Sequence, residues 1–263
     1  MKTKTNFAKN DFIVTFACVL FLLANIAAIG TSGRGRAKEA VCISNLKQLG
    51  SAAAMFMVDN DGYFHRGNCP GGTHIDHWVS AWEPYYGSEY NICLCPEATK
   101  LMSDGNRGKP DAAWGEWEST TPWVKKGQYG SYGINGWVCN KPTTIDSEDY
   151  WRRNDVKGAN AIPLLLDAVW IDAWPKPTDE PPEYNGQDFL QVSGMMARFC
   201  TSRHYGAING LFLDFSARKI GLKELWLLKW SRTYDVEWAR QNEPDWTIGT
   251  GWMAPLKDYD YIP

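Results

Sequence analysis

The chain has 263 residues and a mass of 29.7 kDa, enough for one large domain or two small ones. Hydrophobic residues make up 44% and charged residues 22%, which excludes a wholly disordered, collagen-like or multi-span membrane chain. A net charge of −3 argues against a nucleic-acid-binding protein. Fourteen Trp, 24 Gly and 14 Pro favour a loop-rich body held by large aromatic side chains over a helical bundle.

An uncharged apolar run lies near the N-terminus. Residues 1–11 form a basic, leader-like segment, and residues 12–29 that follow contain no charged side chain. As a helix, this run would be about 27 Å long, close to the ~30 Å of a bilayer core. We therefore expect a transmembrane helix, with a cleaved signal peptide as the alternative. Basic residues flank both ends, so charge does not set the orientation.

Residues 30–62 predict a linker and an amphipathic helix. Three Gly within residues 30–35 predict a bend or break. Beyond them, apolar residues recur every three or four positions until a turn signal at residues 59–62. We expect this stripe to pack against the chain's own sheet, specifically one that contains residues 210–214, rather than against a partner helix. The stripe consists of Cys42, Leu46, Leu49, Ala53 and Phe56.

Residues 63–263 predict one globular domain with little helix. A short apolar run at residues 162–167 predicts a strand, and residues 210–214 and 218–220 predict a pair of strands around a short turn. Leu222, Trp226 and Trp230 lie four positions apart, which indicates a short helix with an aromatic ridge.

Seven cysteines are many for a protein of a reducing compartment. Cys18 lies in the apolar run, and an even number remains beyond it. That number permits full pairing in disulfides, although Cys93 and Cys95 would point to opposite faces of a strand. Free buried thiols are the alternative. The possible disulfide cysteines are Cys42, Cys69, Cys93, Cys95, Cys139 and Cys200.

One short segment gathers residue types that bind zinc. His65, Cys69, His74 and His77 lie within thirteen residues, but their spacing matches no standard zinc pattern. We therefore favour an exposed His-rich loop, with Cys69 in a disulfide, over a metal site, and we expect no cofactor.

Candidates for catalysis are sparse. His204 and Asp214 are the residues that suggest an acid–base pair, but no nucleophile motif accompanies them. We expect both to be structural and the chain not to be an enzyme. The aromatic residues suggest another role, because exposed Trp and Tyr rings can stack on sugars; for the tryptophans, anchoring of loops is the alternative. The relevant tryptophans are Trp114, Trp117, Trp123, Trp246 and Trp252.

Several segments resemble a bacterial family of pilin-like proteins with a prepilin-type N-terminal helix. The family carries a His followed, after nine residues, by Asp-Gly; here His204 is followed at that distance by Asp214. The resemblance extends from about residue 7 to residue 230. Its other landmarks are the segment CISNLKQLG at residues 42–50, DNDGYF at 59–64, Cys95-Pro96, SYGINGW at 131–137, and residues 221–226 with 228–230.

The resemblance implies an α+β, pilin-like fold in which one long N-terminal helix lies half in the membrane and half on a small antiparallel sheet, with long Trp-rich loops. It implies a non-catalytic pilin or pseudopilin subunit of a type II secretion or type IV pilus-like filament. Its partners would be copies of itself or other pilin-like subunits, contacted through the N-terminal helix. Before assembly it would cross the bacterial inner membrane once, with its domain periplasmic or extracellular. A membrane-tethered carbohydrate-binding module is the alternative.

The chain departs from the family's pattern at two places. Family members are processed between Gly and Phe, with Glu as the fifth mature residue; here these positions hold Asn6, Phe7 and Asp11. An uncleaved, membrane-anchored form is therefore an alternative to a processed one. Phe215 replaces the Gly that follows Asp214, and we expect a different turn type because a positive φ strains Phe.

Overall fold

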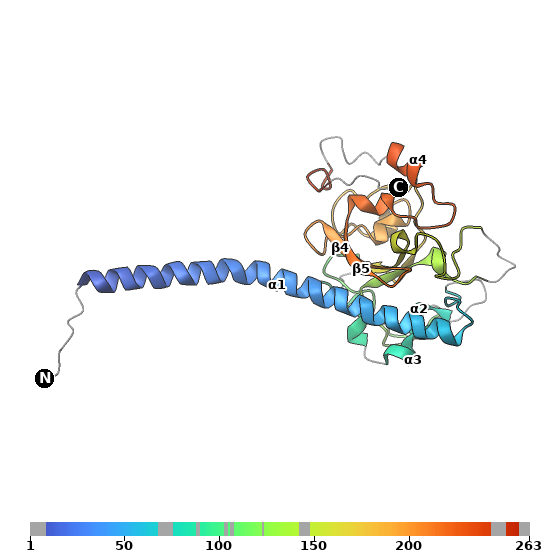
Figure 1. The fold of residues 1–263 in the computed structure, drawn as a ribbon, viewed down its shortest axis with the longest axis horizontal. Coiled ribbons are helices and arrows are strands. Elements are labelled where there is room, and N and C mark those ends of the chain that lie inside the picture. The colour runs from blue at the N-terminus through green and yellow to red at the C-terminus, as the bar shows by residue number, and fades with distance from the viewer. Residues whose placement is uncertain are drawn as a thin grey trace.

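The computed structural model describes residues 9–67, 76–87, 90–102, 105, 108–122, 124–141, 148–242 and 251–257, without the side chains of residues 9–11 and 22–32. It is a mixed α+β protein in which a long N-terminal helix lies against a five-stranded sheet (Figure 1).

The long helix α1 spans Lys9–Asp59, 51 residues in all. Its first half projects from the domain and its second half lies along it (Figure 1). A break at residues 30–35 is wrong, because these residues are helical. The helix does change direction between its two halves (Figure 1). Each Gly keeps both of its backbone hydrogen-bonding groups and costs a helix only about 1 kcal/mol relative to Ala. The expected membrane span and the amphipathic helix are thus two parts of one element.

The second half of α1 presents its apolar stripe to the domain, as predicted. Cys42, Leu46, Leu49 and Ala53 have no exposed surface, whereas Phe56 is partly buried against the same core. The predicted helix end at Asp59 is confirmed.

The sheet has the strand order β3-β1-β2-β4-β5. Its strand pairs are antiparallel except for β1 with β3, which is parallel. The strand predicted at residues 162–167 and the hairpin around residue 214 are both confirmed. The strands are β1 Tyr132–Asn135, β2 Pro163–Asp167, β3 Asp172–Ala173, β4 Ala207–Phe212 and β5 Ala217–Gly221.

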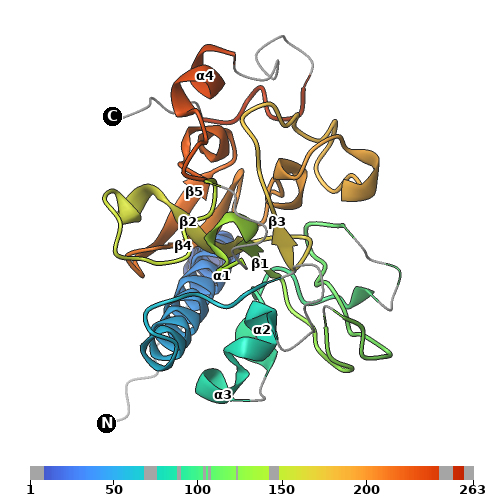
Figure 2. The same ribbon diagram turned by 90° about the vertical axis from the view of Figure 1, so that its right-hand side faces the viewer.

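The sheet is covered on both faces (Figure 2). Leu211 belongs to the core shared with Leu49 of α1, whereas Phe212 belongs to a second core on the other face. The predicted contact between the stripe and residues 210–214 is therefore confirmed. Trp226 and Trp230 fill the second core. Trp226 lies in a 3-10 helix, and Trp230 lies beyond that helix rather than on it.

The hairpin between β4 and β5 keeps a positive φ at Phe215 (63°), so the expectation of a different turn type is wrong. The Asp214 side chain stabilises this turn, since its Oδ1 accepts from the Ser216 N–H at 2.9 Å and from the Ser216 hydroxyl at 2.6 Å. These bonds offset part of the cost of about 1–2 kcal/mol that a left-handed residue incurs.

Short helices complete the fold. Two of them lie beside the end of α1 (Figure 1), η2 precedes β1, and the others come after β1 in the chain. They are α2 Trp78–Ala81, α3 Glu83–Tyr86, α4 Val236–Gln241, and the 3-10 helices η2 Tyr90–Cys93, η4 Gly136–Val138, η6 Ala159–Ala161, η7 Phe189–Gln191, η8 Met196–Arg198 and η9 Lys223–Leu227.

Candidate functional sites

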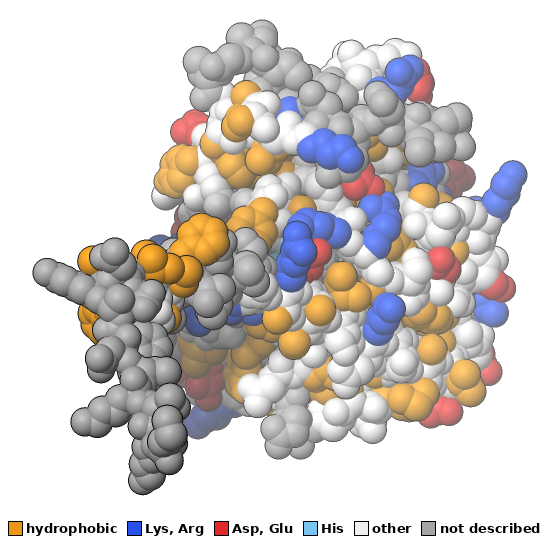
Figure 3. Space-filling model, turned by 60° about the vertical axis from the view of Figure 1, so that its left-hand side comes forward, with side chains coloured by type: hydrophobic (Ala, Val, Ile, Leu, Met, Phe, Trp, Pro, Cys, Tyr) orange, Lys and Arg blue, Asp and Glu red, His pale blue; other side chains and the backbone are white. Residues whose placement is uncertain are grey.

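The first candidate site is the projecting apolar segment, which we define as residues Phe12–Phe21 of α1. Every side chain in it is exposed, and Phe12 and Phe21 are 71% and 70% exposed. Figure 3 shows hydrophobic side chains gathered on this part of the helix. Burying a large apolar side chain is worth about 1.5–3 kcal/mol, so a surface of this kind marks a site for a membrane or a partner.

By length and composition, α1 is apolar enough to cross a membrane. Of the described residues, the stretch Gly33–Asp59 passes that test, but its apolar stripe is occupied by the chain's own sheet. Residues 12–29, the expected span, are described in full only as far as Phe21. Of the processing residues, Asn6 and Phe7 lie outside the described residues, and the side chain of Asp11 does too.

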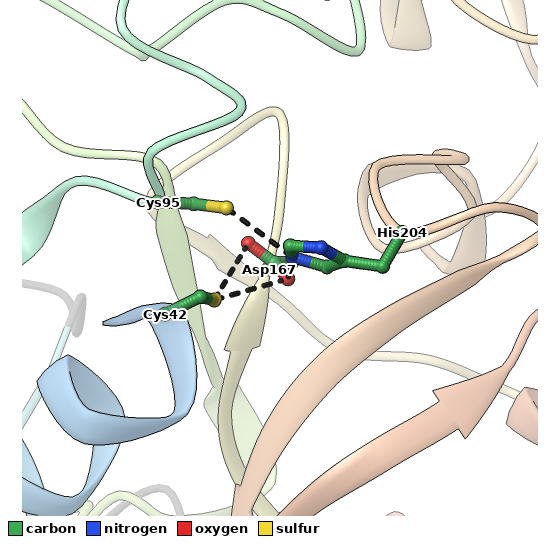
Figure 4. Close-up of side chains that lie close together, drawn as sticks. All are labelled: Cys42, Cys95, Asp167 and His204. Atoms are coloured by element: carbon green, nitrogen blue, oxygen red, sulfur yellow. Dashed lines mark hydrogen bonds and ion pairs between the residues drawn. The ribbon is translucent and has the colours of Figure 1, made fainter. Parts of the chain in front are cut away.

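The second candidate site is a buried cluster of Cys42, Cys95, Asp167 and His204, which we call the Cys–Asp–His cluster (Figure 4). Each residue offers one possible ligand atom, and these atoms all lie within 4.8 Å of one another. All four side chains are buried.

Four separate chain segments build this cluster. Cys42 lies in the buried stripe of α1, and Asp167 ends β2, where it pairs with Tyr132 of β1. Cys95 follows η2 and is fixed by its N–H, which donates to the Ser131 hydroxyl at 2.6 Å. His204 precedes β4, and its N–H donates to the Ala207 carbonyl at 2.9 Å. The cluster therefore lies where helix, sheet and two loops meet.

Asp167 is the centre of charge in the cluster. Its Oδ2 lies 3.1 Å from His204 Nε2 and accepts from the Asn209 N–H at 2.8 Å. Its Oδ1 lies 3.3 Å from Nη1 of Arg203, whose side chain has no exposed surface. Burial by itself would raise the pKa of Asp167, but the hydrogen bond with His204 and the charge of Arg203 outweigh it, and the pKa is lowered.

The same contacts act on the histidine and the thiol. Burial by itself would lower the pKa of His204, but the hydrogen bonds with Asp167 and Cys95 raise it to about 10. Burial raises the pKa of the Cys95 thiol.

Arg203 is held in place by backbone carbonyls as well as by Asp167. Those of Pro110, Ala112, Ser131 and Ala168 accept its hydrogen bonds.

The structure separates His204 from Asp214, the suggested acid–base pair. His204 pairs with Asp167, whereas Asp214 lies exposed in the β4–β5 turn, where it bonds Ser216. Asp167 and Arg203 were missed as site residues. The sequence does contain a signal for Asp167, because it directly follows a run of apolar strand residues. Such a strand is buried, so a carboxylate at its end needs hydrogen-bonding or charged partners.

No disulfide joins any two of the described cysteines, so the disulfides expected among them are absent; Cys69 lies outside the described residues. Each buried thiol has another neighbour instead. Cys139 Sγ lies 3.6 Å from His65 Nε2, and Cys200 Sγ lies 3.5 Å from the Met253 sulfur. Cys93 is buried in the core, where burial raises its pKa to about 12.

The His-rich segment was expected to be an exposed loop, but its two described histidines, His65 and His77, are buried. His65 and His77 are each only 2% exposed, and their ring centres lie 6.4 Å apart. His77 Nε2 lies 3.2 Å from Asp172 Oδ2, and burial lowers the pKa of His65. Cys69 and His74 lie outside the described residues, so a metal site made by all four stays a prediction.

No protein-family model matches the chain, and no curated protein or solved structure shows significant similarity to it. The functional argument therefore rests on the projecting apolar segment and the Cys–Asp–His cluster.

Proposed function

We propose that this chain is a non-catalytic, pilin-like subunit whose projecting helix anchors it in the bacterial inner membrane and later packs with other subunits in a filament. The supporting observation is that a single helix has two surroundings. The second half of α1 is covered on one side by the sheet, whereas the side chains of Phe12–Phe21 are exposed on every face.

The exposed half is suited to a nonaqueous surrounding. A helix that is apolar all round is stable inside a membrane or a helix bundle rather than in water. Residues 12–29 contain no charged side chain, so the run can enter a bilayer core without a large penalty. Continuity of α1 then holds the domain directly against the membrane surface, on its periplasmic or extracellular side.

Subunit packing supplies the same apolar surrounding after the helix leaves the bilayer. The partners are further copies of the chain or other pilin-like subunits. Asp11 precedes the apolar run, at the position from which a carboxylate can pair with a neighbouring chain's N-terminal amine.

The tryptophans give the carbohydrate-binding alternative little support. Trp114 is 1% exposed, Trp117 and Trp252 are partly buried, and Trp123 and Trp246 lie outside the described residues. Among the described tryptophans, Trp238 is the one with an exposed side chain, at 39%. Buried rings anchor loops and cannot stack on a sugar.

Membrane retention tests the anchor. In the native membrane, the wild-type chain should stay in the pellet after alkaline carbonate extraction. The double variant Val19→Lys/Leu20→Lys should be released, since each Lys near the middle of a span costs about 2.5–3.5 kcal/mol. Val58→Lys is the matched control, because Val58 is 81% exposed on the other half of the same helix, and it should remain in the pellet. Release of the intact wild-type chain would disprove the anchor.

Assembly is tested separately. Filaments sheared from cells should contain the chain, and intact-mass analysis of that fraction should show whether the N-terminus begins at Phe7. A chain that is retained in the membrane yet never enters a sheared, sedimenting fraction would contradict the filament part of the proposal and leave the anchor intact.

A further inference from the structure

The Cys–Asp–His cluster has the composition of a zinc site. Thiolate, imidazole and carboxylate are the three ligand types that Zn²⁺ takes in proteins, most often four at a time. The cluster supplies two thiols, one imidazole and one carboxylate, each from a different part of the chain.

The separations between these atoms agree with a tetrahedron. With ordinary zinc–sulfur, zinc–nitrogen and zinc–oxygen bond lengths, neighbouring ligand atoms lie about 3.3–3.8 Å apart. Cys95 Sγ lies 3.4 Å from His204 Nε2, Cys42 Sγ lies 3.6 Å from Asp167 Oδ2, and His204 Nε2 lies 3.1 Å from the same oxygen. The remaining pairs lie within 4.8 Å, so small side-chain movements complete the geometry.

The charges around the cluster balance a bound zinc ion. Two thiolates and one carboxylate around Zn²⁺ leave a charge of −1. The fully buried guanidinium of Arg203, which contacts the other carboxylate oxygen of Asp167, neutralises it.

Neighbouring groups are placed to orient the ligands, as second-layer partners do in metal sites. The Asn209 N–H holds Asp167 Oδ2 at 2.8 Å, and the Tyr132 hydroxyl lies 3.4 Å from Cys42 Sγ. Cys95 is fixed through its N–H.

We propose that Cys42, Cys95, Asp167 and His204 bind one Zn²⁺ ion as a closed structural site that clamps α1 to the sheet. Cys42 and Cys95 bind as thiolates and His204 binds through Nε2, and their protons pass to solvent. All four ligands are buried, so the ion has no open position for water, and a structural role is favoured over a catalytic one. The proposal is independent of membrane anchoring and filament assembly.

Metal analysis of the full-length, reduced chain in mild detergent tests the site. We expect one zinc ion per chain by elemental analysis. After removal of zinc and replacement with Co²⁺, the visible spectrum should show tetrahedral cobalt, and the near-ultraviolet charge-transfer band should have the intensity of two thiolates. Because the spectrum is taken on the wild-type chain, this arm does not depend on a variant folding.

Variants locate the ion. Cys42→Ser and His204→Gln should each lower zinc affinity by more than about 100-fold, and the second-layer variant Tyr132→Phe by about 10-fold. Cys93→Ala and Cys200→Ala are the matched controls, since they remove buried thiols outside the cluster, and each should keep one zinc ion per chain.

Three results would overturn the proposal. The first is a folded, reduced chain that retains no metal in the presence of micromolar zinc. The second is zinc that persists unchanged in both ligand variants. The third is an intact mass lower by two hydrogens together with a linked Cys42–Cys95 peptide, which would show a disulfide in place of the ion.

Discussion

The two halves of α1 share one backbone and differ in what covers them. From Cys42 onward, apolar residues recur on one stripe, the other faces are polar, and the stripe is buried against the sheet. Over Phe12–Phe21 the apolar side chains surround the helix, and all are exposed. Apolar content alone therefore does not separate a helix that belongs to a core from one that needs a membrane or a partner. The distribution of apolar side chains around the helix axis does.

The packed half is also held by polar contacts. Lys38 bonds Glu97 at 2.9 Å, and Glu39 bonds Lys219 of β5 at 2.8 Å. These pairs are partly exposed and worth about 0–1 kcal/mol each. They fix the register of the helix on the domain more than they stabilise it, whereas burial of the apolar stripe supplies most of the stabilisation.

The largest expected effect concerns the buried cation beside that cluster. Arg203→Met leaves Asp167 buried without its guanidinium partner, and removal of one member of a buried ion pair costs about 3–5 kcal/mol. Arg218→Met is the control, because this arginine pairs with Glu224 at the surface with 43% of its side chain exposed, where a pair is worth about 0–1 kcal/mol. Thermal or urea unfolding of the full chain in detergent measures both, and equal losses would contradict the role given to Arg203.

Leucines in the two halves should respond differently to truncation. Leu49 has no exposed surface, whereas Leu20 is 51% exposed. Leu49→Ala should lower the free energy of unfolding of the domain by about 2–5 kcal/mol, and Leu20→Ala by less than about 0.5 kcal/mol. Urea titration of the detergent-solubilised chain, followed by tryptophan fluorescence, compares them. Small and similar effects would mean that the stripe does not pack on the sheet.

The smallest effect lies at the junction between the halves. At Gly33 nothing lies within 4 Å of an added Cβ, but at Gly35 an added Cβ meets the Tyr205 ring. Gly33→Ala should stabilise the helix by about 1 kcal/mol and slow amide exchange at the junction about fivefold. Gly35→Ala should slow it less, since Tyr205 must move. If both variants slow exchange equally, Tyr205 does not pack there.

Sequence patterns predicted the elements whose signal is local. The stripe of α1 and the strands at residues 162–167 and 210–214 follow from periodicity, and the structure has them. The expected break at residues 30–35 is absent, because glycine only weakens a helix that neighbouring turns sustain. The expectation that Phe215 would avoid a positive φ was wrong, because hydrogen bonds to the Asp214 side chain stabilise the left-handed turn.

The Cys–Asp–His cluster could not be predicted from local sequence patterns. Cys42 and Asp167 are 125 residues apart in the sequence, and only the sheet and the packed helix bring them together. Cys42, Cys95 and His204 belong to other sequence patterns, but the residue that joins them, Asp167, is part of no motif. Its pairing with Arg203 depends on the path of the loop before β4, which no local pattern specifies.

The most direct test of the central claim is the accessibility of single cysteines along α1 in native membranes. In a Cys18→Ser background, Val14→Cys, Leu20→Cys, Lys47→Cys and Val58→Cys would be treated with a membrane-impermeant maleimide in opened membranes. All four native side chains are exposed in the folded chain, so the domain itself protects none of them. The account predicts rapid labelling at positions 47 and 58 and none at positions 14 and 20 until the chain is extracted and denatured. Equal labelling at all four positions in native membranes would contradict the account.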